Sequence, residues 1–183
     1  MSQEMTTGQA ERPAPETARV DGAANPAAEV EELFVQHHLR LLRALYLLTG
    51  SAAEAEDLLQ EAFVKVWQRW DRVRTMNDQA GYLYRTAMNA FRSRWRHRLV
   101  ELRHQPKPAS SSDAIESATE RQAVLEALRR VPPRQRLAVV LADFLDRSPA
   151  EVASVLGVEE ATARSLASQG RARVRRELET ADG

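Results

Sequence analysis

Apolar residues recur every three or four positions along most of the chain, which is the spacing of amphipathic helices. The first stripe consists of Leu33, Phe34, Leu41, Leu42, Leu45 and Leu48. Aromatic residues make up only 5% of the chain, while alanine, leucine and arginine are abundant, and this composition favours helices over strands. We therefore predict an all-α fold.

One stretch interrupts this periodicity. Residues 105–116, QPKPASSSDAIE, contain two prolines and three serines, which is typical of a flexible linker. Residues 1–28 show no periodicity and are predicted to be a disordered tail. We therefore expect two small helical bundles joined by a flexible linker. The predicted helices cover about 30–49, 52–70, 78–98, 117–131, 137–144, 149–156 and 160–178.

Three Ser-x-x-Glu sequences predict capping boxes at helix starts. They are Ser51 with Glu54, Ser117 with Glu120, and Ser148 with Glu151. Glycines at 50 and 157 are predicted to end the preceding helices.

The charge is neutral overall but unevenly distributed. Residues 85–104 hold six arginines against one acid, and residues 164–176 hold five arginines and no acid. Two basic stretches far apart in sequence favour two contacts with one polyanion. The chain has 24 arginines and two lysines, which suits bidentate contacts to phosphates or base edges but equally suits a GC-rich genome.

Several classes of protein are disfavoured by what the sequence lacks. There is no cysteine, so neither a disulfide framework nor a thiolate metal site is expected. No apolar run reaches the roughly 20 residues that span a bilayer, and the N-terminus lacks the pattern of a signal peptide. We therefore expect a cytoplasmic protein without a metal or a cofactor.

Residues 148–174 have the layout of a helix-turn-helix: a short capped helix, a glycine turn and a longer helix. Ala153 and Ala163 are small where the two helices would approach each other. Thr162, Arg164 and Ser165 would face outward at the end of the second helix that reaches base edges. A simple helical hairpin is the alternative.

Residues 82–98, YLYRTAMNAFRSRWRHR, alternate aromatic residues with arginines. This pattern is typical of surfaces that stack and hold unpaired bases, and Asn89 could read the edge of an extruded base. The aromatic residues Tyr84, Phe91 and Trp95 follow the apolar stripe and are better explained as core. The arginines fit a solvated face as well as a nucleic-acid contact.

The second predicted helix carries a polar face opposite its apolar stripe. That face consists of Glu54, Asp57, Gln60, Glu61 and Lys65. A solvated face is the simpler interpretation. Trp67 lies beside it, and an aromatic residue next to a polar face is also typical of a protein-docking surface.

Together these segments resemble the extracytoplasmic-function group of bacterial sigma factors over nearly all of Val30 to Leu178. The resemblance rests on AEAEDLLQEAFVKVWQRW (53–70), GYLYRTAMNAFRSRWR (81–96), LRRVPPRQRLAVVL (128–141) and SPAEVASVLGVEEATARS (148–165). It implies that residues 29–104 are sigma domain two, that residues 117–180 are sigma domain four, and that only the linker joins them.

The resemblance also implies residue roles. Binding of core RNA polymerase would fall to Asp57, Gln60, Glu61 and Trp67. Recognition and melting of the minus-ten element, with capture of a flipped base, would fall to Asn89, Ala90, Phe91, Arg92, Arg94, Arg96 and Arg98. The minus-thirty-five element would be contacted by Thr162, Arg164, Ser165 and Arg171. The expected partners are core polymerase and promoter DNA, and an anti-sigma factor is a usual further partner in this family.

The sequence departs from the family pattern in two places. Ser93 stands where many relatives have aspartate, and residues 166–169, LASQ, stand where relatives place basic residues. Fewer cations imply weaker phosphate binding, so we expect weak upstream recognition that Leu166→Arg would strengthen.

Two rival functions remain. A stand-alone helix-turn-helix regulator would need only the second bundle and would leave the acidic and the arginine-aromatic helices unexplained. A helical enzyme is disfavoured because the sequence shows no phosphate loop or nucleophile motif. The histidines, none at metal spacing with Asp or Glu, are His37, His38, His97 and His104.

Overall fold

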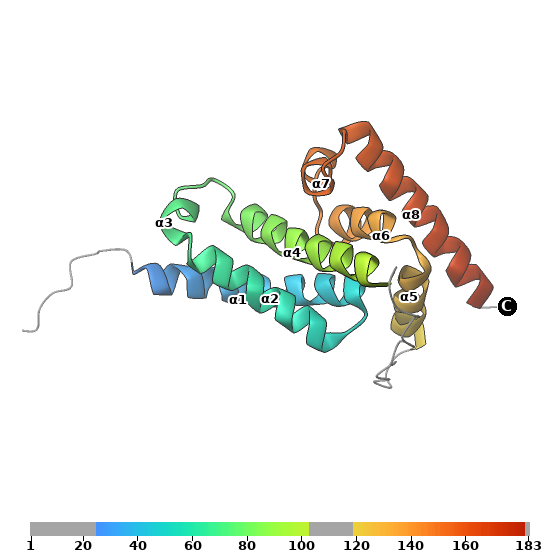
Figure 1. Ribbon diagram of the computed structural model, residues 1–183, viewed down its shortest axis with the longest axis horizontal. Helices are drawn as coiled ribbons and strands as arrows, with labels where there is room; N and C mark the ends of the chain where they lie inside the picture. Colours follow the sequence, from blue (N-terminus) through green and yellow to red (C-terminus); the bar gives the residue numbers. More distant parts are fainter. Residues whose placement is uncertain (1–24, 103–118, 182–183) are drawn as a thin grey trace, which may run out of the picture.

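The computed structural model describes residues 25–102 and 119–181, which form helices and short turns, as predicted for an all-α protein. The helices fall into two groups, α1–α4 and α5–α8 (Figure 1). The first group consists of α1 (Pro26–Thr49), α2 (Ala52–Trp67), α3 (Trp70–Val73) and α4 (Gln79–Leu102). The second group consists of α5 (Thr119–Arg130), α6 (Pro133–Val139), the π-helical turn η1 (Val140–Phe144), α7 (Pro149–Leu156) and α8 (Glu160–Ala181).

Helix α1 begins earlier than the sequence predicted. The Asn25 side chain accepts a hydrogen bond from the Ala27 N–H at 3.1 Å, which caps the first turn. Residues 26–28 are therefore helical, and assigning them to a disordered tail was wrong; residues 1–24 lie outside the described residues. At the other end Gly50 takes a left-handed φ of 69°, which ends the helix as expected.

The three predicted capping boxes have different outcomes. Ser148 and Glu151 form a complete box at the start of α7. Ser51 caps α2 by accepting from the Glu54 N–H at 3.3 Å, but the Glu54 carboxylate pairs with Arg98 at 2.9 Å instead of reaching back. Ser117 lies outside the described residues.

The core of the first bundle follows the predicted stripes of α2 and α4, although the helix predicted over 52–70 ends at Trp67 and Trp70 begins the separate helix α3. The buried stripe residues are Ala55, Leu59, Ala62, Phe63, Val66, Trp70, Leu83, Tyr84, Ala87 and Phe91. Trp95 was also expected in the core but is only partly buried. Phe34, assigned to the stripe of α1, is 41% exposed, because it lies on the outer edge of the α1–α2 pair against Phe63.

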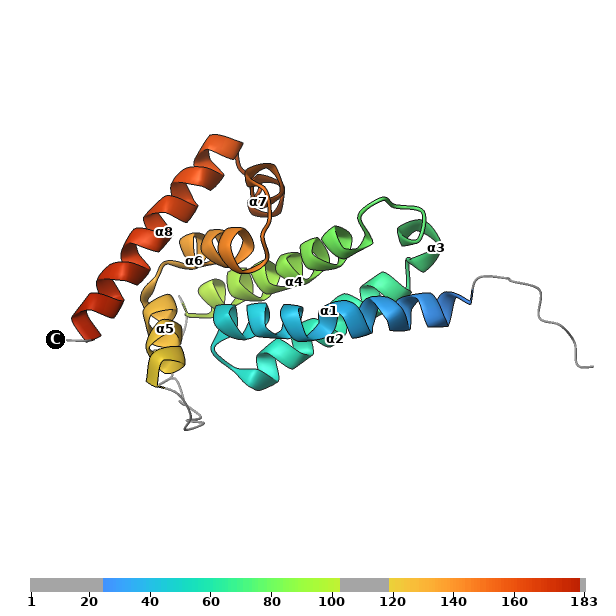
Figure 2. The ribbon, with the colours of Figure 1, turned by 180° about the vertical axis from the view of Figure 1, so that it is seen from behind.

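In the second bundle α8 packs across α5, α6 and α7 (Figure 2). The single helix predicted over 137–144 is divided here, because the backbone passes from α6 into the π-helical turn η1. The Leu145 N–H donates a hydrogen bond to the Val140 carbonyl at 3.0 Å, which closes this wider turn.

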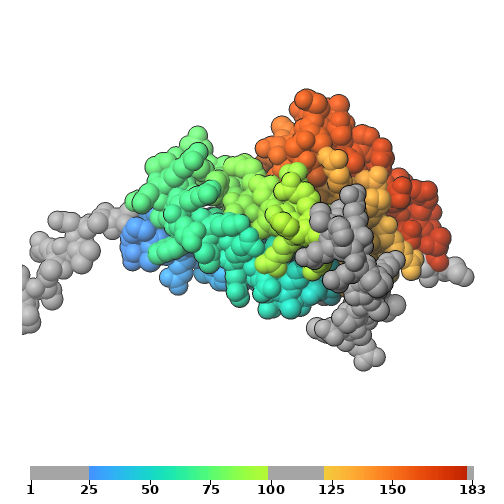
Figure 3. Space-filling model, viewed as in Figure 1, coloured from blue at the N-terminus to red at the C-terminus, as the bar shows by residue number. Residues whose placement is uncertain are grey.

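The two bundles also pack directly against each other. Helix α1 contacts α5, α6 and η1, and α4 contacts α7. Figure 3 shows the surface of α7 lying directly against that of α4. Buried residues of both bundles form one hydrophobic cluster. The prediction that only the linker joins the bundles was therefore wrong; the linker itself lies outside the described residues.

Candidate functional site

The helix-turn-helix geometry is present in α7 and α8. Gly157 takes a φ of 64°, and its N–H donates to the Ala153 carbonyl at the end of α7. Ala153 and Ala163 are buried where the two helices meet, as predicted from their size. The predicted helix-turn-helix layout, a short helix and a long helix joined by a glycine turn, is confirmed, and its turn depends on a residue without a Cβ atom.

The predicted reading residues lie at the start of α8. Thr162, Arg164 and Ser165 are all exposed in its first two turns. This end of a helix carries unpaired N–H groups and partial positive charge, which favours contact with phosphates. In the structure Arg164 forms an ion pair with Glu160, which lies one turn earlier in α8.

Arg171 is also exposed, but its guanidinium has a partner within the protein. Its guanidinium binds the Asp143 carboxylate through both ends, with Nη2 to Oδ1 at 2.7 Å and Nε to Oδ2 at 2.8 Å. These hydrogen bonds raise the pKa of Arg171. The sequence did not foresee this partner, because Asp143 lies on η1, 28 residues away.

The residues predicted to recognise the minus-ten element divide into two groups on α4. Asn89, Arg96 and Arg98 are exposed. Ala90 and Phe91 are buried, so in this conformation they shape the helix from inside and do not offer a contact surface. Arg92 and Arg94 are partly buried because each has a partner within the protein.

Arginines of α4 pair with the acidic face of α2. Arg94 contacts Glu61 at 3.2 Å and Asp57 at 3.7 Å, and the Arg98 guanidinium contacts Glu54 at 2.9 Å. The pKa of Glu61 is lowered, first by its hydrogen bond from Lys65 and then by Arg94. Two groups of residues predicted to bind different partners, polymerase and DNA, thus contact each other here.

Exposed apolar side chains lie on α1 and α2. Trp67 is 49% exposed, and Val64 lies one turn before it on α2. Phe34 on α1 packs edge-on against Phe63 with ring centroids 4.9 Å apart. We call Phe34, Val35, Leu39, Val64 and Trp67 the α1–α2 apolar surface. The sequence pointed to Trp67 alone: Val35, Leu39 and Val64 lie off the predicted stripes, and Phe34 was assigned to the stripe of α1.

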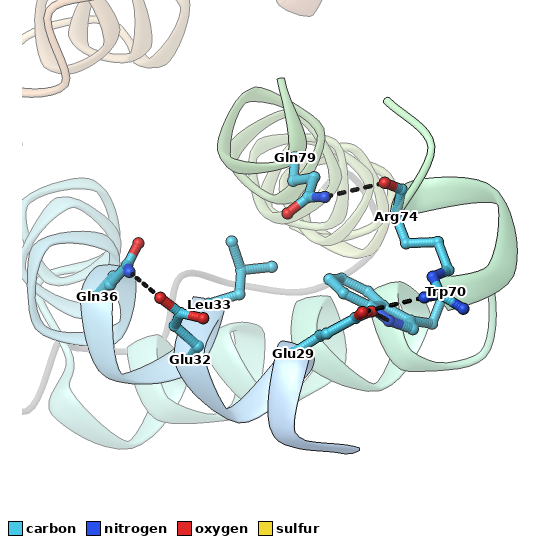
Figure 4. A pocket seen from close by; sticks show the side chains of 7 residues that line it. All are labelled: Glu29, Glu32, Leu33, Gln36, Trp70, Arg74 and Gln79. Atoms are coloured by element: carbon cyan, nitrogen blue, oxygen red, sulfur yellow. Dashed lines mark hydrogen bonds and ion pairs between the residues drawn. The ribbon is translucent and has the colours of Figure 1, made fainter. Parts of the chain in front are cut away.

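A polar depression of about 360 Å³ lies at the start of α1 (Figure 4). Its walls are held by Glu29, which accepts from Trp70 Nε1 at 2.8 Å and pairs with Arg74 at 3.0 Å. Gln79 donates to the Arg74 carbonyl at 3.2 Å. These contacts fasten the first turn of α1 to α3, so the residues that line the depression are explained by their role in holding these two helices together.

None of the described helices has the length and apolarity to cross a membrane.

Two segments match known families. Residues 33–99 match Sigma-70 region 2, and residues 121–174 match Sigma-70 region 4. The first covers most of α1–α4 and the second covers most of α5–α8.

Related proteins agree with these matches. The chain is 33% identical over 156 residues to the RNA polymerase sigma-E factor of Streptomyces avermitilis, covering 84% of this chain and 87% of that one. It is 33% identical over 152 residues to the ECF RNA polymerase sigma factor SigM of Mycobacterium tuberculosis, covering 81% and 76%.

Solved structures show the same fold. The sigma factor RpoE of Bartonella quintana, crystallised with the anti-sigma factor NepR, superimposes with a TM-score of 0.73 at 24% identity, over 82% of this chain and 97% of that one. The extent and order of these matches show the family: the chain belongs to the extracytoplasmic function sigma factors, which bind core RNA polymerase and direct promoter-specific initiation of transcription.

Proposed function

We propose that this sigma factor docks on core polymerase through α2, opens the minus-ten element with α4 and contacts the minus-thirty-five element with the start of α8. It catalyses no reaction itself and acts in the cytoplasm. The observation that carries the proposal is the order of the two matched regions on one chain, each with exposed polar side chains on the helix concerned.

Docking on the polymerase is assigned to the exposed face of α2. This face carries the polar side chains of Asp57, Gln60 and Glu61 and the large aromatic ring of Trp67. Aromatic residues are enriched at the centres of protein interfaces, and a polar rim around them supplies specificity. The neighbouring side chains of the α1–α2 apolar surface extend the area that a partner could cover.

Reading of the minus-ten element is assigned to α4. The exposed Asn89 amide can donate and accept at the edge of an extruded base. Arg92, Arg94, Arg96 and Arg98 follow the same helix and would neutralise phosphates along the strand. Ala90 and Phe91 would act from inside the bundle by fixing the position of this helix.

Contact with the minus-thirty-five element is assigned to Thr162, Arg164 and Ser165. Arg171 could join them only by leaving Asp143, since both ends of its guanidinium are engaged. Each domain alone offers few contacts to duplex DNA. When the polymerase holds both domains at a fixed spacing, the second contact becomes intramolecular and the two act bivalently.

An anti-sigma protein is proposed as a further partner. The support is the similarity in fold to a sigma factor that was crystallised with its anti-sigma factor. Co-purification with an anti-sigma protein from the same genome would test this partner separately from promoter recognition.

Run-off transcription with core polymerase on genomic fragments tests the main proposal and maps the promoters. We expect Asn89→Ala to reduce open-complex formation about tenfold, because one base-edge contact is lost. The matched control is Asn77→Ala, which removes an exposed amide in the turn before α4. Strong binding of the pure protein to duplex DNA, with no promoter-specific transcripts, would instead support a stand-alone regulator.

A further inference from the structure

Gln169 is the last residue of the stretch 166–169, in which the sequence departs from the basic pattern of the family. It is exposed on α8, and its side-chain amide takes part in two hydrogen bonds. Gln135 Nε2 of α6 donates to Gln169 Oε1 at 2.8 Å, and Gln169 Nε2 donates to Ser165 Oγ at 3.1 Å. Gln169 therefore connects α6 to a residue proposed to contact the minus-thirty-five element.

The close approach of α8 to α6 and η1 holds this connection in place. Gly170 is buried there, and a Cβ atom on it would lie 2.5 Å from Val139 Cγ2 and 2.9 Å from the Gln135 carbonyl oxygen. The two helices approach this closely because glycine has no side chain. The next residue, Arg171, binds Asp143 of η1 through both ends of its guanidinium. Three consecutive residues of α8 are thus held against α6 and η1, which limits the rotation of α8 about its own axis.

The direction of the two hydrogen bonds is set at their buried end. Gln135 Oε1 is buried, and within the described residues it has no hydrogen-bond partner. Turning the amides of Gln135 and Gln169 round would exchange this one carbonyl oxygen for two N–H donors at the same buried position. Two buried donors without acceptors cost more than one such oxygen. The Gln135 amide nitrogen therefore faces Gln169, and the Gln169 amide nitrogen faces Ser165.

This direction leaves the Ser165 hydroxyl as a donor. Its oxygen accepts from Gln169, so its own hydrogen points away from that amide. The hydroxyls of Thr49 and Thr86 donate to a carbonyl of their own helix, whereas Ser165 makes no such bond within the described residues. At the exposed start of α8, the hydrogen of Ser165 is thus available to an acceptor outside the protein.

We propose that Gln169 is a positioning residue, which orients the Ser165 hydroxyl as a hydrogen-bond donor to an acceptor atom of the upstream DNA. The proposal rests on the function proposed above for the start of α8 and adds the direction of one contact. The acceptors within reach of such a donor are phosphate oxygens and, in the major groove, purine N7, guanine O6 and thymine O4. The chain thus uses an oriented neutral donor where the family pattern has basic residues.

The effect of Gln169 is measured through Ser165. The full chain is held on core polymerase and titrated with a duplex that carries the upstream sequence of a promoter mapped by run-off transcription. We expect Ser165→Ala to weaken binding about tenfold, which is the effect of losing one hydrogen bond. Gln169→Met should weaken it about threefold, because a hydroxyl that is no longer oriented has three staggered positions. When Ser165→Ala is already present, Gln169→Met should cause no further loss.

A second variant reverses the hydrogen bond without removing it. In Gln169→Glu the carboxylate can accept from both Gln135 and Ser165, so the packing is kept, but the hydroxyl donates to the carboxylate and not to DNA. Ser168→Glu adds the same charge at the neighbouring exposed position and measures repulsion from phosphates alone. Beyond the loss in this control, we expect Gln169→Glu to weaken binding about tenfold, as Ser165→Ala does.

Modified duplexes identify the acceptor atom. Methylphosphonate linkages replace single phosphate oxygens, whereas 7-deazapurines, 2-aminopurine and 4-thiothymine alter N7, O6 and O4 in turn. One of these changes should abolish the difference in affinity between the parent protein and Ser165→Ala, and its position distinguishes a phosphate from a base edge. A difference that survives every modification would show that Ser165 donates to no acceptor on the DNA.

The outcomes separate this proposal from the proposed function. The positioning role of Gln169 is wrong if Gln169→Met causes the same loss with and without Ser165→Ala, or if Gln169→Glu is no worse than Ser168→Glu. It is also wrong if Ser165→Ala has no effect while Thr162→Ala and Arg164→Ala weaken binding, and the function proposed for α8 then stands. If none of the three alanine variants weakens binding, the assignment of the upstream element to the start of α8 fails, and the positioning of Ser165 fails with it.

Discussion

Arginine side chains in this protein differ mainly in the acceptor that they contact. Arg94 and Arg98 pair with carboxylates of α2, whereas Arg129 and Arg136 bind main-chain carbonyls of α1. Exposed ion pairs contribute little to stability and are weakened by salt. Hydrogen bonds from a buried guanidinium are less screened, so their loss is felt more strongly. The contacts between the bundles should therefore outlast those between α2 and α4 as salt is raised.

We expect His37 to make the stability of the protein depend on pH. Its Nδ1 lies 3.0 Å from the Tyr84 hydroxyl, and its pKa is lowered, first by burial and then by Arg147 and Arg40, against an opposing effect of Asp78. The folded protein therefore prefers the neutral ring. The contribution of the neutral His37 ring to the free energy of unfolding is fully present above the ordinary histidine pKa of 6.5. It is lost as the pH falls below that value towards the lowered pKa of the folded protein.

We expect the urea midpoint to fall between pH 7.5 and pH 5.5, and to fall less in His37→Asn, which can still reach the Tyr84 hydroxyl. Parallel urea titrations at the two pH values measure the difference. An equal fall in parent and variant would show that His37 is not responsible.

The two glycines with left-handed backbones should respond differently to alanine. At Gly157 a Cβ atom would meet only Arg92 Nη2 at 3.7 Å, so the cost is the backbone strain of about 1 kcal/mol. At Gly50 a Cβ atom would lie 2.3 Å from Arg129 Nε, so the Arg129 contact must also shift. We expect Gly50→Ala to lower the free energy of unfolding by about 1 kcal/mol more than Gly157→Ala. Urea unfolding of both variants tests this order, and equal losses would contradict it.

At the scale of the element, α8 divides into a packed face and an exposed face that carries the residues proposed to contact DNA, which we call the reading face. Leu166 and Ala167 lie against the hydrophobic cluster, while Ser168 and Gln169 are exposed. The expected gain in DNA affinity from Leu166→Arg is therefore opposed by lost packing. Ser168 offers the same change of charge on the exposed face, so it is the better site for testing weak upstream recognition.

We expect Ser168→Arg to raise the affinity of the polymerase-bound factor for an upstream duplex several-fold, about 3- to 10-fold, and to steepen its salt dependence by about one ion. Thr180→Arg, which adds the same charge at the exposed far end of α8, is the control. Fluorescence titrations at several salt concentrations measure both quantities. Equal effects of the two changes would mean that the added charge acts at long range and not at the reading face.

At the scale of the whole molecule, the two bundles share one hydrophobic cluster and should unfold together. All three tryptophans, Trp67, Trp70 and Trp95, lie in the first bundle, so their fluorescence reports that bundle alone, whereas far-ultraviolet circular dichroism reports the helices of both. We expect the two urea curves of the parent protein to coincide. In Arg136→Met they should separate, because the contact between the bundles is weakened; separate curves already in the parent protein would contradict coupling.

The sequence by itself determined most of the helices and several of their ends. The apolar stripes of α2 and α4, the Ser148–Glu151 box and the Gly157 turn all depend on residues at most four positions apart, and the structure confirms them. The exposed positions of Thr162, Arg164 and Ser165 at the start of α8 were located for the same reason, since a helix-turn-helix places them relative to its own turn. Matching of the two regions then established the family.

Only the tertiary structure decided which faces meet. The pairing of Arg94 with Glu61, of Arg171 with Asp143 and of Arg136 with the Leu48 carbonyl joins residues 28 to 88 positions apart. No periodicity encodes such pairs, because they depend on the packing of whole helices and on how the two bundles are placed. A local pattern can show that an arginine lies on a polar face. Whether that arginine contacts DNA, a carboxylate or the end of another helix is decided by what the fold brings opposite it.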